Sequence, residues 1–342
     1  MSEGPPFHDI LAAVADGQTL TRNQAQHAFS LLMEGQTSQA QTAAFLMALR
    51  VRTEQVEEIA GAAQAMRAKA TRVRAPAGAI DTCGTGGDGL GTVNVSTATA
   101  LVVAGCGVPV AKHGNRAVSS KSGSSDVLDA LGVNVAAPVD AVEQAMRVAG
   151  VGFLLATVYH PAMRHVGPVR ADLGLRTVFN LLGPLANPAG VRRQVIGVFA
   201  DRWLEPLARV LHELESEHAW IVHGADGMDE LTTTGATHVA ELKGGQVRTF
   251  TVAPEDAGLS RAAPAELVGG DAAANAASIR DLLDGRRSPY RDIVVLNAAA
   301  ALIVAQRADS LEAGAAQATH SIDSGAAGTA LDRLVACTQA QQ

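Results

Sequence analysis

The sequence predicts an α/β protein with a small all-helical unit at its N-terminal end and a larger unit built on a mainly parallel sheet. Residues 8–71 show only helical spacing of apolar residues, whereas short apolar runs alternate with helical segments from residue 78 onward. Of the 342 residues, 47% are hydrophobic but only 3% are aromatic, so small aliphatic side chains must form the core. Strands that alternate with helices are typical of parallel sheets covered by helices.

Composition narrows the class of protein. The net charge of −7 argues against general affinity for nucleic acid or anionic membranes. The three cysteines, Cys83, Cys106 and Cys337, lack metal-site spacing and indicate reduced thiols. The longest nearly apolar run, residues 97–111, is too short to span a bilayer, and no signal peptide is expected. We therefore expect a cytoplasmic protein that binds neither nucleic acid nor membrane.

The N-terminal helices show clear start signals. Thr21 with Gln24, and Ser38 with Gln41, fit the capping box, in which the third helical side chain reciprocates the N-cap hydroxyl. Thr53 is a third N-cap candidate, because three glutamates follow it within five residues and favour the helix dipole. These signals predict a helical bundle without chemistry of its own.

The larger unit should place two flexible loops at one edge of its sheet. We expect strands at residues 79–80, 108–110, 152–155, 194–200, 219–223, 247–252 and 293–296, and helices at 97–104, 124–131, 140–148 and 204–214. A glycine-rich loop follows the first strand, and a loop rich in glycine and serine follows the second. Because ligands bind at the carboxyl ends of parallel strands, both loops are candidates for a binding site.

The first loop resembles a dinucleotide fingerprint but lacks its context. Gly84, Gly86 and Gly89 match G-x-G-x-x-G after a strand. A dinucleotide-binding fold needs an acidic residue about 20 positions later for the ribose. No Asp or Glu occurs between Asp88 and Asp126, and the Gly-Lys-Ser/Thr pattern of a P-loop is absent too. We interpret the loop as a phosphate cradle, in which glycine lets backbone N–H groups approach an anion.

The acid-free interval carries basic and hydroxyl side chains. Its basic residues are Lys112, His113, Arg116 and Lys121, and four such groups within ten positions favour a polyanionic ligand. Asn94, Ser96 and Thr97 lie where the next helix begins. They could cap that helix or bind phosphate, and Ser96 could also ligate a divalent ion.

Later segments supply carboxylates and an arginine. Asp229 and Glu230 follow a strand and a glycine turn, where they could ligate Mg²⁺ or form an ordinary solvated turn. Arg170 lies among apolar residues and should pair with an internal acid or a ligand carboxylate. His160 could equally pack in the core or contact a substrate. No nucleophile–base pair is evident, which indicates catalysis by positioning and electrostatics rather than by an acid or base.

Several long motifs together resemble the anthranilate phosphoribosyltransferase family. They span residues 81–88, 94–97, 112–116, 119–124, 160–163, 176–185, 226–230 and 323–327. The resemblance covers nearly the whole chain. It implies the fold that this family shares with pyrimidine nucleoside phosphorylases, with a small domain of residues 1–73, joined by about 170–190, and a large domain of residues 74–169 and 191–342. It also implies a homodimer.

The resemblance further implies transfer of 5-phosphoribose from phosphoribosyl pyrophosphate (PRPP) to the amine of anthranilate, in tryptophan biosynthesis, with two Mg²⁺ ions. PRPP would be bound by Gly84, Gly86, Gly87, Asp88, Thr92, Asn94, Ser96, Thr97, Lys112 and Ser124. Anthranilate would contact Gly84, His113, Asn115, His160 and Arg170. The metal ligands would be Ser96 for one ion and Asp229 and Glu230 for the other. The alternatives are a nucleoside phosphorylase of the same fold and a non-catalytic relative that binds nucleic acid.

Overall fold

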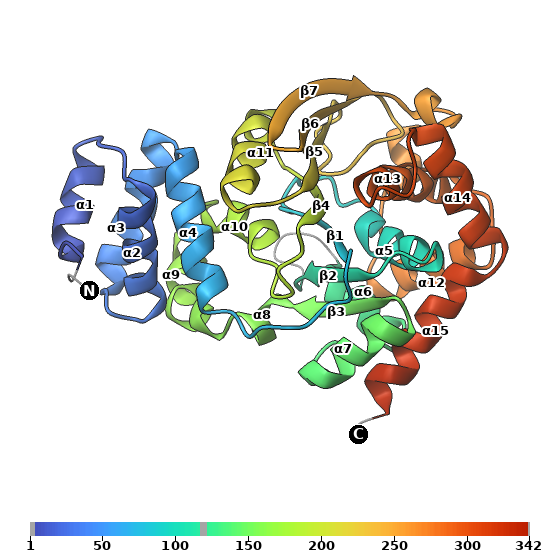
Figure 1. Ribbon diagram of the computed structural model, residues 1–342, viewed down its shortest axis with the longest axis horizontal. Helices are drawn as coiled ribbons and strands as arrows, with labels where there is room; N and C mark the ends of the chain where they lie inside the picture. Colours follow the sequence, from blue (N-terminus) through green and yellow to red (C-terminus); the bar gives the residue numbers. More distant parts are fainter. Residues whose placement is uncertain (1–3, 117–121, 341–342) are drawn as a thin grey trace.

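A seven-stranded sheet forms the centre of the computed structural model, which describes residues 4–116 and 122–340 (Figure 1). The strands are β1 (Ile80–Gly84), β2 (Val110–Gly114), β3 (Val151–Leu155), β4 (Arg193–Gly197), β5 (His218–Gly224), β6 (Thr237–Lys243) and β7 (Gln246–Val252). Their order is β3-β2-β1-β4-β5-β6-β7. The first five strands pair in parallel, and β6 and β7 extend the sheet antiparallel. The predicted α/β class with a mainly parallel sheet is confirmed.

Helices cover both faces of the sheet. The N-terminal bundle consists of α1 (Phe7–Ala15), α2 (Arg22–Met33), α3 (Gln39–Arg52) and α4 (Val56–Ala68). The remaining helices are α5 (Val95–Gly105), α6 (Ser124–Ala130), α7 (Val139–Val148), α8 (Ala156–Tyr159), α9 (Gly167–Leu173), α10 (Phe179–Leu185), α11 (Leu204–Glu213), α12 (Ala272–Leu283), α13 (Pro289–Val304), α14 (Leu311–Asp323) and α15 (Ala326–Gln339). In Figure 1 the bundle lies at one end of the molecule, and α12–α15 lie beyond the opposite side of the sheet. No helix within the described residues is long and apolar enough to cross a membrane.

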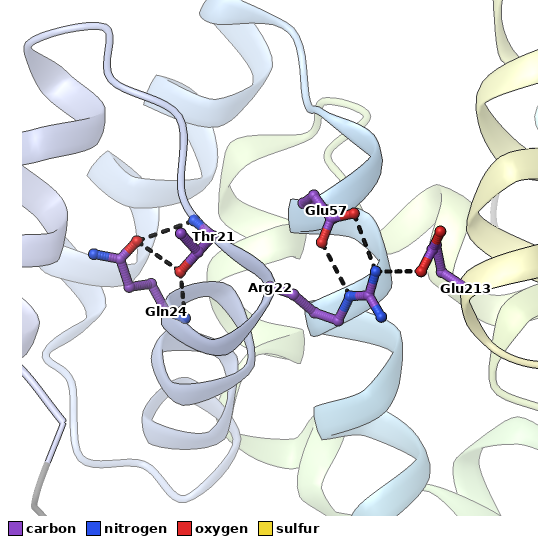
Figure 2. Close-up of polar contacts among 5 residues, drawn as sticks. All are labelled: Thr21, Arg22, Gln24, Glu57 and Glu213. Atoms are coloured by element: carbon purple, nitrogen blue, oxygen red, sulfur yellow. Dashed lines mark hydrogen bonds and ion pairs between the residues drawn. The ribbon is translucent and has the colours of Figure 1, made fainter.

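Two of the three predicted N-caps are confirmed. The Thr21 side chain accepts a hydrogen bond from the Gln24 backbone, and the Gln24 side chain accepts one from the Thr21 N–H, as Figure 2 shows. Ser38 and Gln41 make the same reciprocal pair at the start of α3. Each pair satisfies backbone donors that the helix itself leaves open.

The prediction of Thr53 as an N-cap is wrong. Thr53 ends α3 with a φ of 74°, and the N-cap of α4 is Gln55. The Glu58 carboxylate accepts the Gln55 N–H at 2.8 Å and the Leu20 N–H at 2.8 Å. The glutamates were therefore a correct sign of a helix start, but the start lies two residues later.

The bundle and the sheet share one apolar core. Phe29 of α2 packs edge-on against Phe179 of α10, with ring centroids 5.6 Å apart, and the same cluster continues to residues of β4 and β5. Arg22 adds a polar link, because its guanidinium binds Glu57 of α4 at 3.0 Å and also contacts Glu213 of α11 (Figure 2). These partly exposed ion pairs contribute little to stability by themselves, so apolar packing joins the two parts.

The opposite face of the sheet is covered by α5 and α13. The predicted strand at residues 293–296 is wrong, because these residues lie within the 16-residue helix α13, which is almost entirely buried. Ser288 caps this helix, and a continuous apolar run of such length is a buried helix rather than a strand. The sequence reading also missed β6, which pairs with β7 through the turn at Gly244 and Gly245, both with positive φ.

Strands β1 and β2 run further toward their carboxyl ends than predicted. The expected strands at residues 79–80 and 108–110 mark only where β1 and β2 begin, so Asp81 and His113 lie inside the sheet. These buried polar groups are paired: Asp81 accepts hydrogen bonds from the His113 N–H at 3.1 Å and from Asn187 at 2.8 Å. Both glycine-containing loops consequently leave the same edge of the sheet.

Candidate functional site

Two loops that are distant in sequence meet at the carboxyl edge of the sheet. The glycine loop (residues 84–89) follows β1, and the acid loop (residues 225–231) follows β5. The Asp229 carboxylate accepts the Gly86 N–H at 2.7 Å, and Glu230 accepts the Ser96 N–H at 3.2 Å. The predicted carboxylates therefore reach the predicted phosphate cradle and the first turn of α5.

Glycine is required where these loops cross. A Cβ on Gly84 would lie 2.6 Å from the Asp229 carboxylate, and a Cβ on Gly197, at the end of β4, would lie 1.5 Å from the Asp229 carbonyl oxygen. Gly84 and Gly197 are partners in the β1–β4 register. The absence of both side chains lets the acid loop lie directly on the strand ends.

The acid loop is a fixed turn rather than a solvated one. The Asp226 carboxylate accepts hydrogen bonds from the Met228 N–H at 3.1 Å and from the hydroxyls of Thr232 and Thr234 at 2.7 and 2.6 Å. Asp229 and Glu230 are themselves only partly exposed. The loop thus holds both carboxylates toward the strand ends.

The ionised forms of Asp229 and Glu230 are unfavourable unless a cation compensates their charges. Burial raises the pKa of Glu230 to about 7, against the opposing effect of the Lys112 ammonium. Burial also raises the pKa of Asp229 well above its ordinary value, and the nearby negative charges of Glu230 and Asp88 raise it further. Hard carboxylate oxygens are ligands that Mg²⁺ uses together with substrate phosphates, and a divalent ion would relieve this repulsion. The donor set therefore fits Mg²⁺.

Lys112 lies beneath the site rather than on a flexible loop. It is part of β2 and only 2% exposed, and its ammonium donates to the Thr82 carbonyl at 2.6 Å and to the Ser96 hydroxyl at 3.2 Å. Ser96 and the buried Thr97 belong to the first turn of α5, whose N-cap is Asn94. The alternative that Ser96 and Thr97 serve as N-caps is therefore wrong.

The segments around the glycine loop are tied down by residues that the sequence reading missed. The Asn94 side chain makes no helix-capping bond; instead it donates to the Ser122 carbonyl at 3.3 Å and accepts from Asn275 of α12 at 2.8 Å. Arg176 donates to the Gly87 carbonyl and stacks on Phe199 at 4.5 Å. No local motif marked Asn275, whereas Arg176 belonged to a recognised motif without an assigned role.

Backbone conformation and local contacts define the rest of the glycine loop. Gly86 and Gly87 have φ of 64° and 78°, in the region that favours glycine. Asp88 accepts the Leu90 N–H at 3.1 Å, and Thr92 forms an antiparallel bridge with Val268. The loop is therefore shaped by its own turns and by the segment before α12.

A second, neutral part of the site lies beside β2. His113 and His160 are buried with ring centroids 5.1 Å apart. His113 Nδ1 lies 3.0 Å from the Gly183 carbonyl, which can only accept, so Nδ1 carries the proton and Nε2 keeps a free lone pair. Within the described residues, His113 Nε2 is buried without a hydrogen-bond partner, and the buried His160 ring interacts with the backbone of Ala186. Burial lowers the pKa of His113 to about 3 and that of His160 to about 4, so both rings are neutral at pH 7.

Arg170 brings an uncompensated positive charge to the same region. Its guanidinium lies 5.4 Å from the centroid of Phe179, at the start of α10, and His113 contacts Gly183 one turn later in that helix. Arg170 makes no ion pair with any residue that the structure describes, and burial lowers its pKa. Of the two alternatives from the sequence, a pair with an internal acid is therefore not found among the described residues.

The second predicted loop is only partly described. Asn115 is exposed, and its side chain accepts the Arg116 N–H at 2.9 Å. Arg116 pairs with Asp126 at 3.7 Å rather than remaining unpaired, and Ser124 begins α6 beside Gly114. Lys121 and the first half of the motif at residues 119–124 lie outside the described residues. Over the described ranges, no group of three or more His, Cys, Asp or Glu side chains could hold a metal ion by itself.

Comparison with known proteins identifies the family. Residues 8–70 match the helical bundle domain of the glycosyl transferase family, and residues 76–328 match its a/b domain. An anthranilate phosphoribosyltransferase of Paramagnetospirillum magneticum is 60% identical over 330 residues, which is 96% of this chain and 95% of that protein. The chain belongs to the anthranilate phosphoribosyltransferase family.

Solved structures of anthranilate phosphoribosyltransferases share the whole fold. The enzyme from Thermus thermophilus is 45% identical, with a TM-score of 0.92 over 97% of this chain and 99% of that one. The Saccharomyces cerevisiae enzyme in complex with PRPP and Mg is 28% identical, with a TM-score of 0.89 over 97% and 98%. The yeast enzyme has also been solved with 4-fluoroanthranilate, with 27% identity and a TM-score of 0.88 over 98% and 99%.

Proposed function

We propose that this protein transfers the 5-phosphoribosyl group from PRPP to the amine of anthranilate, giving N-(5-phosphoribosyl)anthranilate and pyrophosphate in tryptophan biosynthesis. The observation that carries the proposal is the meeting of Asp229 and Glu230 with the N–H groups of Gly86 and Ser96. This arrangement suits a polyanion bound with a divalent cation. Family membership and the yeast relative bound to PRPP and Mg support the same reading.

The PRPP half of the site would use backbone donors and a buried cation. The proposed PRPP-binding residues are Gly84, Gly86, Gly87, Asp88, Thr92, Asn94, Ser96, Thr97, Lys112 and Ser124. Backbone N–H groups of the glycine loop and the N-terminus of α5 can donate to phosphate oxygens, and the α5 dipole favours negative charge. Lys112 adds a fixed positive charge below that helix terminus.

The proposed cofactor is Mg²⁺, with two ions per subunit. Ser96 would bind one ion, while Asp229 and Glu230 would bind the other. When bound, Mg²⁺ neutralises the negative charge that develops on the departing pyrophosphate. The raised pKa values of the two carboxylates favour this reading, because ionised carboxylates at this place need a compensating cation.

The acceptor half would orient anthranilate without an acid or base. The proposed contacts are Gly84, His113, Asn115, His160 and Arg170. Arg170 would bind the carboxylate through its planar fork, and the free lone pair of His113 Nε2 could accept an N–H of the amine. With a pKa of about 3, His113 is too weak a base to take a proton from the amine.

The chemistry then depends on alignment. The amine lone pair forms the bond to ribose C1, the C1–O bond breaks with its electron pair going to pyrophosphate, and the amine loses its proton to solvent afterwards. The protein positions both reactants and stabilises the leaving group, and ideal alignment supplies up to about 7–11 kcal/mol of barrier reduction. This agrees with the lack of a catalytic acid or base in the sequence prediction.

A second proposal concerns the oligomeric state of the protein and its location in the cell. We infer a cytoplasmic homodimer joined through the small domain, residues 1–73 with about 170–190. Large apolar side chains on this part of the molecule support an interface: Val51 is 79% exposed and Leu175 is 49% exposed. Light scattering of the purified protein should give twice the 35.1 kDa chain mass, and a monomer at micromolar concentration would contradict the dimer.

An assay of anthranilate fluorescence tests the proposed reaction. With PRPP and Mg²⁺ present, fluorescence should fall with time as the amine is substituted, and omission of either should stop the decrease. Constant fluorescence in the complete mixture would contradict the proposal. Phosphate-dependent cleavage of a pyrimidine nucleoside by the same preparation would then favour the nucleoside phosphorylase alternative.

A further inference from the structure

One face of α13 contacts both parts of the proposed PRPP and metal site. Tyr290 and Asn297 are seven residues apart, about two helical turns, so their side chains leave α13 on the same side. Tyr290 contacts Asn94 at the start of α5, and Asn297 contacts Leu231, the residue after Glu230. We propose that Asn297 and Tyr290 are positioning residues, which hold the acid loop and the N-terminus of α5 in register; this rests on the proposed function.

Asn297 pairs with both backbone groups of one residue. Its Oδ1 accepts the Leu231 N–H at 3.0 Å, and its Nδ2 donates to the Leu231 carbonyl at 2.8 Å and to the Ile293 carbonyl at 2.8 Å. Asn297 is 2% exposed, and Leu231 is fully buried. A side-chain amide combines the acceptor and donors that this contact requires. Loss of the amide would leave buried backbone groups unpaired.

This contact fixes the carboxylates because Leu231 directly follows them. On the other side of the acid loop, Asp226 holds the turn, and Gly197 leaves room for the Asp229 carbonyl. Asn297 is therefore the anchor at the far end, where the chain leaves Glu230. A ligand oxygen moved by even a fraction of an ångström changes the geometry that Mg²⁺ demands. Outer residues that orient metal ligands affect metal affinity for this reason.

Tyr290 acts on the other component of the site. It is 6% exposed, and its hydroxyl donates to the Asn94 carbonyl at 3.0 Å. The same carbonyl accepts the Ala98 N–H at 3.3 Å within the first turn of α5. Tyr290 thus holds the N-cap of the helix whose Ser96 contacts both Lys112 and Glu230. Removal of the Tyr290 hydroxyl should loosen the N-terminus of α5, where phosphate is proposed to bind, and should leave the carboxylates of the acid loop in place.

The experiment compares Asn297→Ala and Tyr290→Phe with the intact protein and a stability control. Mn²⁺ serves as the spectroscopic probe for Mg²⁺, and its binding with PRPP but without anthranilate is followed by electron paramagnetic resonance. Asn297→Ala should weaken Mn²⁺ binding about 10–100-fold. Tyr290→Phe should raise the KM for PRPP about 2- to 10-fold. Neither should change the KM for anthranilate.

Ser310→Ala is the matched control. Ser310 caps α14, which packs on α13, and it accepts the Ala313 N–H at 3.1 Å without touching the site. It should lower the thermal midpoint but leave Mn²⁺ binding unchanged. If Asn297→Ala does not fold, Asn297→Asp keeps the volume and one acceptor but loses the donors, and it should weaken Mn²⁺ binding in the same way.

The outcomes separate this inference from the proposed function. Asn297 variants that bind Mn²⁺ and PRPP as the intact protein does, or a Ser310→Ala variant that loses Mn²⁺ equally, would overturn the positioning role. Equal rises in the KM of both substrates for Tyr290→Phe would also contradict it. By contrast, an intact protein that binds Mn²⁺ with PRPP but leaves anthranilate unchanged would refute only the proposed reaction.

Discussion

The two halves of the site differ in how their polar groups are satisfied. In the PRPP half, Asp229 and Glu230 each accept a backbone N–H, and Lys112 donates to two oxygens. In the acceptor half, His113 Nε2 is buried without a partner among the described residues. Buried polar atoms without partners are costly. We therefore expect the acceptor half to gain hydrogen bonds when anthranilate binds.

The PRPP half has the opposite property. The Gly86 and Ser96 N–H groups that a phosphate would use are held by carboxylates that a metal ion would use. A phosphate must displace these carboxylates, and a cation gives them a new partner. We therefore expect Mg²⁺ and PRPP to bind together, whereas anthranilate binding should depend on a single charged contact and on the neutral rings.

The largest effect is expected from neutralising the carboxylates. Asp229→Asn with Glu230→Gln keeps the volume but removes the negative charges, and metal ions supply several kcal/mol of transition-state stabilisation. The kcat/KM should fall at least about 100-fold, with a higher Mg²⁺ requirement in steady-state kinetics. Glu255→Gln is the control, because it removes a surface carboxylate that pairs with Arg261 at 2.8 Å. It should leave kcat/KM and the Mg²⁺ requirement unchanged. Unaltered Mg²⁺ dependence in the double variant would remove the metal role.

A smaller and more selective effect is expected at Arg170. Arg170→Ala should raise the KM for anthranilate about 10–100-fold, since hydrogen bonds to charged groups contribute about 1.5–3 kcal/mol. The KM for PRPP should change much less. Arg170→Lys keeps the charge but not the planar fork. Its KM for anthranilate should therefore lie between that of the intact protein and that of Arg170→Ala. Equal rises for both substrates in steady-state assays would exclude Arg170 from the anthranilate contact.

The smallest effect is a pH dependence of stability without ligands. Because the pKa of Glu230 is raised to about 7, its protonated form stabilises the fold, and this contribution is lost as pH rises through about 7. Asp229 acts in the same direction. The lowered pKa values of His113 and His160 have the opposite effect on stability. They destabilise the fold only as pH falls below about 6.5, where histidine in the unfolded chain binds a proton.

The thermal midpoint of the ligand-free protein should therefore fall between about pH 6 and pH 8. The Asp229→Asn, Glu230→Gln variant should show a flatter profile, and Mg²⁺ with PRPP should remove the decline in the intact protein. A midpoint that rises over this interval in the intact protein, or an identical slope in the variant, would contradict the electrostatic description of the acid loop.

Sequence patterns predicted the elements whose causes are local. The reciprocal caps at Thr21 and Ser38 were predicted correctly, because the capping box joins each N-cap residue to a glutamine only three positions later. The start of α4 was placed two residues too early, because Thr53 ends α3 with a positive φ and Gln55 takes the N-cap position. The buried helix α13 was misread at residues 293–296, because a fully buried helix and a buried strand share an apolar composition.

Sequence motifs pointed to the residues that meet at the candidate site, but not to the residues that hold them in place. The glycine loop, Lys112 and the pair of Asp229 and Glu230 carry recognisable chemistry. Asn275 and Asn297 do not, since each acts through a contact with a residue that is far away in the sequence. Likewise, the need for glycine at Gly197 becomes visible only when the acid loop lies on it. Such supports depend on how strands and loops meet in space.

Calorimetric titration of PRPP, with and without Mg²⁺, tests the division of the site most directly. The titration uses the intact protein, Glu230→Gln and Arg170→Ala. The intact protein and Arg170→Ala should bind PRPP with similar affinity and only in the presence of Mg²⁺, whereas Glu230→Gln should bind it at least about 10-fold more weakly. Equal loss of PRPP affinity in both variants, or binding that does not depend on Mg²⁺, would contradict two chemically distinct halves.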